Sequence, residues 1–320
     1  MHSFGHIARS TKRAVAVALP LALVAILHGA AYAQTNRGHV VVLVSHEAQP
    51  YKEALAGLQQ QLASGPSDVQ VAVTLLQGDA RAAATAIQAM RENVAAVVTF
   101  GTIATQAALT ADTQAPVVAA LVFNSDSLRH AASATAVTLD MPLEAQFDWL
   151  RKMLPESKTV GVLYNPKENQ QRIDAAVRVA QQRGFRLIAR PVDAPQDLPG
   201  ALESLSRQVE VLWSVTDAIA ISPQTAQPIL LFSFRNRIPL VGLSSTWVKA
   251  GALYSLDWDY GDIGRQAGEL VQRILRGAKP ADLPPASPRK LTYAINLKSA
   301  QQLGVDVPRS LVQGARQVFE

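Results

Sequence analysis

The order of the apolar segments constrains the fold of this chain more than any other feature. From residue 38 onward, short runs rich in β-branched residues alternate with longer stretches in which apolar residues recur every three or four positions. Parallel strands need helical crossovers, and a sheet that is covered on both faces has continuously apolar strands. The alternation therefore predicts an α/β fold with doubly wound parallel sheets.

The expected elements form two successive series, which predict two similar lobes. The first series has strands at residues 39–45, 69–76, 94–100, 116–123 and 135–139, and helices at 51–62, 79–90 and 102–111. The second has strands at 159–164, 185–190, 209–214, 239–243 and 251–256, and helices at 141–154, 168–183, 198–206, 224–236 and 259–276. Residues 280–288 contain four prolines and predict an extended connection to a strand at 290–295 and two last helices, from Lys298 and Pro308.

The N-terminus has the pattern of a secretory signal peptide. Arg9, Lys12 and Arg13 precede an apolar run at residues 14–27, and residues 31–33, Ala-Tyr-Ala, form a cleavage site that makes Gln34 the expected mature start. An uncleaved membrane anchor is the alternative, although the run is shorter than the ~20 residues of a spanning helix. We expect residues 1–33 to be removed and the protein to reach the periplasm.

Composition and missing motifs exclude several functional classes. The absence of cysteine excludes disulfides, thiolate metal sites, cysteine nucleophiles and a lipid anchor. The net charge of +5 falls to +2 without residues 1–33, so composition does not support nucleic-acid binding. The chain has no HExxH, Walker A, GxGxxG or GxSxG motif. We therefore expect no enzyme activity, no cofactor and no metal.

Ligands of open α/β sheets bind beyond the carboxyl ends of the strands, where loops and helix N-termini present unpaired N–H groups. The candidate ligand-binding residues stand at these ends: Ser45, His46, Gly101, Thr102, Phe123, Asn165, Asn169, Asp217, Ser244 and Trp258.

Several of these residues have a second interpretation. The step Gly101-Thr102 suits an anionic group such as a carboxylate, but Thr102 is also a good helix N-cap. Asp217 suits an ammonium group, but it also suits a loop carboxylate or a cap. His46 is either a ligand contact or a polar loop residue. Trp258 belongs to an aromatic cluster with Trp213, Trp247, Tyr254 and Tyr260, which forms either a ligand wall or interlobe packing.

An ordered set of motifs resembles a known family. The set includes Gly-Ala-Leu-Tyr-Ser at residues 251–255, Asp259-Tyr260 with Gly264 to Ala267, residues 274–280, Leu283-Pro284, the tail at 295–298, Gly101-Thr102, and residues 161–166 with Glu168-Asn169. On these residues, the chain resembles the ABC-transporter substrate-binding proteins that include the tryptophan and tyrosine binders. Residues 45–51 and Gln170 depart from the pattern of those aromatic-amino-acid binders.

The resemblance implies a type I periplasmic-binding-protein fold, in which two Rossmann-like lobes are joined by a three-crossover hinge and close around a ligand. It divides the chain into lobe I, residues 34–139 with 257–289, and lobe II, residues 140–256 with 290–320. Gly101, Thr102, Asn165, Asn169 and Asp217 then correspond to positions in the cleft.

We therefore expect the periplasmic solute-binding component of an ABC importer, a monomer that delivers a small organic ligand to a membrane permease. An aromatic or branched amino acid is the expected ligand. One alternative is a periplasmic sensor of the same fold that signals to a membrane protein. Another is an exported α/β hydrolase with Ser45 or Ser244 as its nucleophile.

Overall fold

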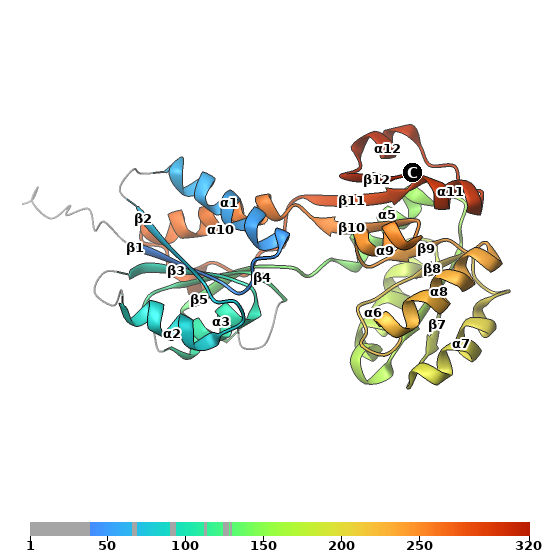
Figure 1. The fold of residues 1–320 in the computed structure, drawn as a ribbon, viewed down its shortest axis with the longest axis horizontal. Helices are drawn as coiled ribbons and strands as arrows, with labels where there is room; N and C mark the ends of the chain where they lie inside the picture. Colours follow the sequence, from blue (N-terminus) through green and yellow to red (C-terminus); the bar gives the residue numbers. More distant parts are fainter. Residues whose placement is uncertain (1–38, 66–68, 90–93, 112–113, 124–127, 129) are drawn as a thin grey trace, which may run out of the picture. The chain divides into compact units, whose positions relative to one another are not determined.

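The structure is a computed structural model that describes residues 39–320 apart from 66–68, 90–93, 112–113, 124–127 and 129 (Figure 1). The expected signal peptide at residues 1–33 lies outside the described residues. Residues 38–320 form one compact unit that contains two sheets. No helix in the described part of the chain has both the length and the apolar character needed to span a bilayer.

Sheet A is parallel, with five described strands in the order β2-β1-β3-β4-β5. These strands are β1 (His39–Val44), β2 (Gln70–Leu75), β3 (Val94–Phe100), β4 (Val117–Val122) and β5 (Ala134–Thr138). Helices α1 (Gln49–Ala63) and α10 (Tyr260–Leu275) cover one face, and α2 (Ala80–Ala89) and α3 (Thr102–Thr110) cover the other (Figure 1). Both faces of β1 are buried, because Val40 and Val42 join the first core while Val41 and Leu43 join the second.

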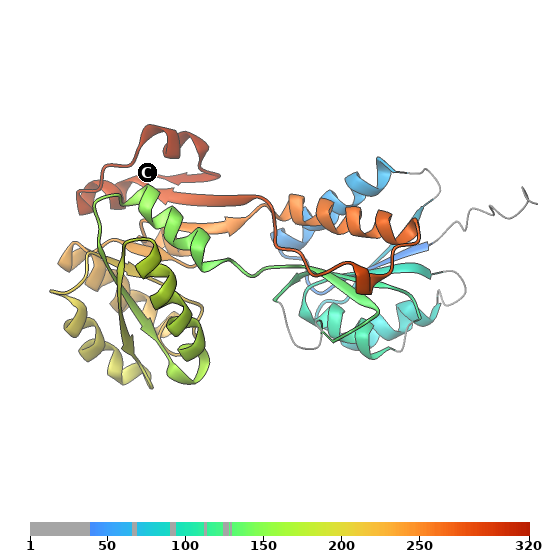
Figure 2. The same cartoon turned by 180° about the vertical axis from the view of Figure 1, so that it is seen from behind.

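Sheet B has seven described strands in the order β12-β11-β10-β9-β8-β6-β7. They are β6 (Thr159–Tyr164), β7 (Arg186–Pro191), β8 (Val211–Trp213), β9 (Leu240–Gly242), β10 (Tyr254–Trp258), β11 (Leu291–Asn296) and β12 (Gln317–Phe319). One core contains side chains of α5 (Leu143–Met153) and α6 (Pro166–Gln182). The other core contains side chains of α7 (Leu198–Leu205), α8 (Pro223–Asn236) and α9 (Ser245–Ala250). Figures 1 and 2 show the course of these helices beside sheet B. The α/β class with parallel sheets is thus confirmed.

The chain passes three times between the regions of sheet A and sheet B: after β5, after β10, and before β11. The second and third passages lie side by side, since β10 and β11 pair antiparallel and Asp259 N donates to Lys290 O at 3.0 Å. Strand β10 extends to Trp258, two residues beyond the predicted end of lobe II at residue 256. The lobe boundaries themselves stay a prediction.

Two local expectations were wrong, and two features of sheet B were not predicted. The strand expected at 251–256 begins only at Tyr254, because helix α9 runs to Ala250 and is followed by its C-cap Gly251, which has a φ of 128°. The first residues of the extended connection at 280–288 form a short 3₁₀ helix, Pro280–Asp282. Strand β12 and the antiparallel pairing of β11 were not anticipated, because strand direction depends on the passage that the chain takes and not on local periodicity.

Candidate functional site

The carboxyl edge of sheet A is built around Gly101, which follows β3. Its φ of 92° and ψ of 165° are accessible to glycine alone, and a Cβ atom would lie 2.8 Å from Ser45 Oγ and 2.9 Å from the ring of Tyr51. The buried Ser45 hydroxyl, which follows β1, accepts the N–H of Ala104 at 3.0 Å. Ser45 therefore satisfies one of the free N–H groups at the start of α3.

The other predicted residues of this edge face solvent. Gly101, and not Thr102, is the N-cap of α3, so the capping interpretation of Thr102 was wrong, and the Thr102 side chain is exposed. His46 is exposed and lies edge-on to Tyr51, with ring centroids 5.7 Å apart. Phe123 retains 62% of its accessible surface. Burial raises the pKa of Tyr51 and keeps its hydroxyl neutral.

The carboxyl edge of sheet B is organised by Asp217, which is 3% exposed. Oδ1 accepts the N–H groups of Ile219 at 2.9 Å and Ala220 at 2.7 Å. Oδ2 accepts the N–H of Asn165 and, at 2.8 Å, the side-chain amide of Asn169. A carboxylate has about four lone-pair sites, so these four donors use its capacity. In this structure Asp217 holds the loop after β8 against the loop after β6.

Asn165 and Asn169 complete this network. Asn165 Oδ1 accepts the N–H of Lys167 at 3.0 Å and caps α6, while Nδ2 donates to Val192 O at 3.0 Å. Asn169 Nδ2 also donates to Thr216 O at 3.0 Å. No donor in the described residues uses Asn169 Oδ1, which leaves an acceptor at this edge.

A cavity of about 320 Å³ adjoins the edge of sheet B and the first two chain passages. Three of the predicted site residues line it, namely Phe123, Asn169 and Trp258. The other predicted residues lie elsewhere: Ser45, His46, Gly101 and Thr102 at the edge of sheet A, Asn165 and Asp217 in the network behind Asn169, and Ser244 before α9. Ligand contact stays a prediction for all ten.

Two tryptophans of the aromatic cluster line this cavity with their N–H groups already bonded. Trp213 Nε1 donates to Gln146 Oε1, and Trp258 Nε1 donates to the carbonyl of Leu139, both at 3.1 Å. Tyr260 lines the cavity too, whereas Tyr254 is fully buried in the core of sheet B and Trp247 packs against the core formed with α8. The indoles therefore offer apolar ring surface rather than hydrogen-bond donors.

Three charged residues of the cavity were missed from the sequence: Arg172, Asp140 and Asp257. Arg172 lies one turn beyond Asn169 on α6, and this spacing of three residues was the available signal. Partial desolvation lowers the pKa of Arg172, the nearby Asp140 partly offsets this, and the guanidinium stays charged at neutral pH. Burial, followed by the Asp257 carboxylate that accepts the Tyr260 hydroxyl at 2.6 Å, raises the pKa of Tyr260.

Ser214, which follows β8, was missed as well. It is 6% exposed and lines the cavity, and its Oγ has no hydrogen-bond partner within the described residues. The described residues contain no group of three or more His, Asp or Glu side chains arranged to hold a metal ion. The cavity thus combines aromatic surface, one guanidinium, two carboxylates and unused hydroxyl and amide oxygens, which suits a small polar molecule with an apolar part.

Two curated proteins match parts of this chain. A tyrosine-binding protein of Clostridioides difficile is 28% identical over 174 residues, which are 53% of this chain and 48% of that protein, so the match spans about half of the relative's length. An uncharacterised protein of Rickettsia prowazekii is 23% identical over 263 residues, 81% of this chain and 83% of that protein.

Solved structures share the fold. A ligand-free, open substrate-binding protein with adhesive properties from Clostridium difficile matches with a TM-score of 0.75 at 19% identity, over 88% of this chain and 99% of that one. An ABC domain from Streptococcus pneumoniae in complex with L-tryptophan matches with a TM-score of 0.58 at 22% identity, with the same coverage. Both support the expected type I periplasmic-binding-protein fold.

The family model described as ABC transporter substrate binding protein matches residues 39–319. This range contains both sheets, both carboxyl edges and the cavity. The chain therefore belongs to the ABC transporter substrate-binding protein family, whose members are binding proteins and not enzymes, as the missing catalytic motifs led us to expect.

Proposed function

We propose that this protein is the periplasmic solute-binding component of an ABC importer and that its ligand is an amino acid with an aromatic or branched side chain. The observation that carries the proposal is the cavity of about 320 Å³, in which Arg172 and two carboxylates lie beside Trp213 and Trp258. Few small metabolites need both charge signs and an apolar wall within one cavity of this size. A zwitterionic amino acid needs both, because it carries an ammonium group, a carboxylate and an apolar side chain.

The charged residues match the two ends of such a zwitterion. A guanidinium binds a carboxylate through two parallel hydrogen bonds, so Arg172 is the proposed partner of the ligand carboxylate. Asp140, Asp257 and the unused Oδ1 of Asn169 are the proposed acceptors for the ammonium group. We assign the ammonium group to these acceptors and not to Asp217. The carboxylate of Asp217 already accepts four hydrogen bonds within the protein, which suits a positioning role.

The aromatic rings that line the cavity favour a ligand with an aromatic side chain. Trp213 and Trp258 have their N–H groups bonded internally, and the largely exposed Phe123 ring gains by leaving water when a ligand covers it. The tyrosine-binding relative and the tryptophan complex of a protein with the same fold support this choice of side chain.

The proposal includes closure of the two lobes, residues 34–139 with 257–289 and residues 140–256 with 290–320. Sheet A would then supply Ser45, His46, Gly101, Thr102 and Phe123, and sheet B Asn165, Asn169, Ser244 and the neighbouring Trp258, with Asp217 positioning Asn169. The free N–H groups at Gly101-Thr102 would add to Arg172 in binding the carboxylate. Closure would remove this charge pair from water and strengthen it.

Calorimetric titration of the purified protein with L-tryptophan, L-tyrosine and L-leucine tests the proposal. We expect binding of at least one, and a stabilisation of about 2.7 kcal/mol at 100 times Kd in thermal unfolding. Arg172→Gln should weaken binding at least tenfold, because the ligand carboxylate loses a charged partner. Arg178→Gln, on the same helix but outside the cavity lining, is the matched control and should bind normally. No binding across the twenty amino acids would overturn the proposal.

Transport is tested in cells. Deletion of the protein should abolish uptake of the labelled ligand if it delivers that ligand to a permease, whereas unchanged uptake with a lost response would favour the sensor alternative. Sequencing of the exported protein should give Gln34 as its first residue, and the ligand-free protein should sediment as a monomer. An intact N-terminus would identify residues 1–33 as an anchor instead.

A further inference from the structure

Sheet A has a topological switch point between β1 and β3. In the strand order β2-β1-β3-β4, strand β2 lies on one side of β1, and β3 and β4 lie on the other. Helix α1 follows β1 and packs in the first core, whereas α3 follows β3 and packs in the second, so the two helices cover opposite faces of the sheet (Figure 1). Open α/β sheets bind their ligands beyond the carboxyl ends of the strands at such a point. Side chains that lie above β1 and β3 are therefore the first candidates for ligand contact on this sheet.

Tyr51, in the first turn of α1, reaches from one face of the sheet to the start of α3 on the other. A Cβ atom added at Gly101, the N-cap of α3, would lie 2.9 Å from Tyr51 Cε1 and 3.0 Å from the Tyr51 hydroxyl oxygen. The side chain also packs against the first core, which fixes the direction of the ring. The phenolic hydroxyl is therefore held directly beside the N-terminus of α3.

The Tyr51 hydroxyl makes no hydrogen bond within the described part of the chain. The hydroxyls of three other tyrosines, Tyr164, Tyr260 and Tyr293, each donate to a protein oxygen at 2.6 to 3.1 Å. Burial is the one cause that raises the pKa of Tyr51, with no contribution from a neighbouring charge or hydrogen bond. The hydroxyl therefore stays protonated at neutral pH, and its O–H group is a donor that no described residue uses.

Two backbone donors lie beside this hydroxyl at the start of α3. The N–H groups of Thr102 and Ile103 have no acceptor among the described residues, whereas the next one, from Ala104, is bonded to Ser45 Oγ. The N-terminus of a helix also carries partial positive charge. Donors and positive charge together suit a group that only accepts hydrogen bonds, and the carboxylate is the one charged group of an amino acid that does so.

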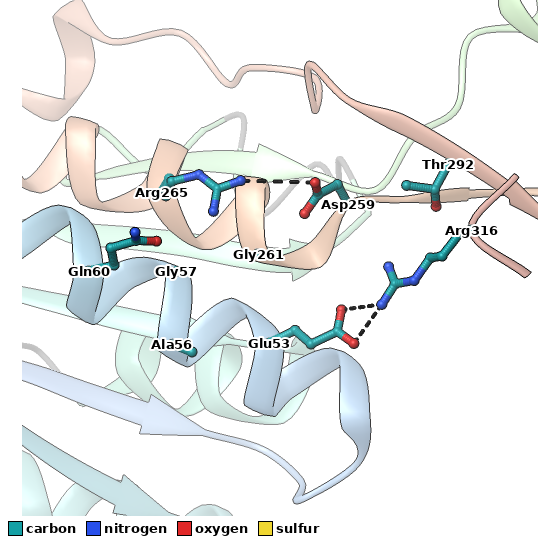
Figure 3. A pocket seen from close by; sticks show the side chains of 9 residues that line it. All are labelled: Glu53, Ala56, Gly57, Gln60, Asp259, Gly261, Arg265, Thr292 and Arg316. Carbon is teal, nitrogen blue, oxygen red and sulfur yellow. Dashed lines mark hydrogen bonds and ion pairs between the residues drawn. The ribbon is translucent and has the colours of Figure 1, made fainter. Parts of the chain in front are cut away.

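Helix α1 is itself firmly placed. Gly57 packs so closely on α10 that an added Cβ atom would collide with the carbonyl oxygen of Gly261. Glu53, two residues after Tyr51, accepts two hydrogen bonds from Arg316, at 2.6 and 2.7 Å (Figure 3). The position of Tyr51 is therefore set before a ligand arrives, and preorganisation of this kind lowers the free-energy cost of binding.

We propose that the Tyr51 hydroxyl donates a hydrogen bond to the carboxylate of the amino-acid ligand and is a specificity-determining residue for that group. The assignment rests on the proposed function, in which closure brings the carboxylate bound by Arg172 to the edge of sheet A. A carboxylate has about four lone-pair sites. Two accept the fork of Arg172, which leaves one for Tyr51 and one for the N–H of Thr102.

The hydroxyl selects a free carboxylate against the corresponding amide. A primary amide has one acceptor oxygen, and its NH₂ group presents donors to the donors of the protein. A hydrogen bond to a charged group contributes enough to change affinity at least about tenfold when it is removed. Loss of the Tyr51 hydroxyl should therefore weaken binding of the amino acid and leave binding of its amide almost unchanged.

Titration calorimetry tests this assignment with the most tightly bound of L-tryptophan, L-tyrosine and L-leucine and with its primary amide. Tyr51→Phe should bind the amino acid at least about tenfold more weakly, and the amide within about twofold of the unmodified protein. Its midpoint of thermal unfolding should not change, because the hydroxyl has no partner to lose. Tyr293→Phe is the matched control: its hydroxyl donates to Leu311 O at 2.8 Å, so it should unfold at a lower temperature and bind both ligands normally.

The outcomes distinguish this contact from the proposed function. Equal affinity of Tyr51→Phe and the unmodified protein for the amino acid would overturn the Tyr51 contact, and the amino-acid proposal would stand because the ligand still binds. Equal weakening of the amino acid and its amide would also overturn the contact, since the ring and not a hydrogen bond to the carboxylate would then matter. No binding across the twenty amino acids would overturn both.

Discussion

The carboxyl edges of the two sheets differ in how many internal hydrogen bonds their polar side chains make. At the edge of sheet B, Asp217 joins two loops through four hydrogen bonds and is almost completely buried. At the edge of sheet A, one buried hydroxyl, that of Ser45, bonds the start of α3, and Phe123 and His46 face water. The edge of sheet B is therefore held by internal hydrogen bonds, whereas Phe123 and His46 at the edge of sheet A face solvent; in the proposed site each edge would supply one half.

This difference indicates where affinity and specificity arise. A preorganised network costs little to bring to its bound geometry, so the edge of sheet B can orient a ligand as soon as it arrives. The exposed apolar and polar groups at the edge of sheet A contribute to the binding free energy only when closure removes them from water. Variants at the two edges should accordingly separate into those that change stability and those that change affinity.

The largest effect is expected for Asp217→Ala. It leaves four N–H donors without their acceptor in a buried loop, and we expect the free energy of unfolding to fall by about 4 kcal/mol. Urea denaturation measures this loss. The exposed Asp193→Ala, in the same lobe, should change stability by less than about 0.5 kcal/mol. A loss below about 1 kcal/mol for Asp217→Ala would remove the distinction between the two edges.

Gly101→Ala should have the next largest effect, a loss of about 2 to 3 kcal/mol in the free energy of unfolding. The new Cβ meets Ser45 Oγ and Tyr51, and the backbone conformation belongs to glycine. Gly277→Ala is the control: its φ of 97° is also positive, but no atom lies within 4 Å of the added Cβ. Equal losses for both variants would show that the contact with Ser45 and Tyr51 is unimportant.

A smaller, pH-dependent effect is expected for Arg289→Gln. Burial acts to raise the pKa of Asp262, but hydrogen bonds and charge from Gln266 and Arg289 outweigh it, so the net pKa lies below its usual value. This stabilisation is present above the unfolded pKa of about 3.9 and is lost as the pH falls through the lower folded value.

We expect Arg289→Gln to cost about 1 kcal/mol at pH 7 and progressively less below about pH 3.9, as followed by denaturant unfolding at each pH. A cost that does not depend on pH would mean that Arg289 stabilises the protein by packing. Glu210→Gln, at the residue before β8, should also cost stability at neutral pH and less in acid, because the hydrogen bond from the backbone N–H of Lys158 is the main cause that lowers the pKa of Glu210.

The smallest effect on stability is expected for Phe123→Ser, below about 0.5 kcal/mol, because the side chain is already largely exposed. Its effect on affinity should be larger: L-tryptophan should bind several-fold more weakly by calorimetry, since the ligand loses an apolar contact. A stability loss above about 1 kcal/mol together with unchanged affinity would place Phe123 in the scaffold and not in the site.

Periodicity was enough to predict most strands of both sheets, because a buried parallel strand is apolar on both faces, as in β1 and β4. The network around Asp217 could not be predicted, since it needs Asn165 and Asp217, which are 52 residues apart, to meet across two loops. Ser45 was assigned to the correct edge, but its bond to Ala104 depends on the spacing between β1 and β3. Arg172 could not be predicted from its distance to a strand end, because it lies in the second turn of α6, three residues beyond Asn169.

Hydrogen–deuterium exchange with and without saturating L-tryptophan tests the central claim most directly, because it reads both edges in one experiment. The account predicts slower exchange in residues 101–106 of sheet A and, in the same samples, in residues 165–172 and 213–220 of sheet B. Protection of the sheet B segments alone would contradict closure and leave a site built from one lobe. No protection at either edge would contradict the amino-acid site itself.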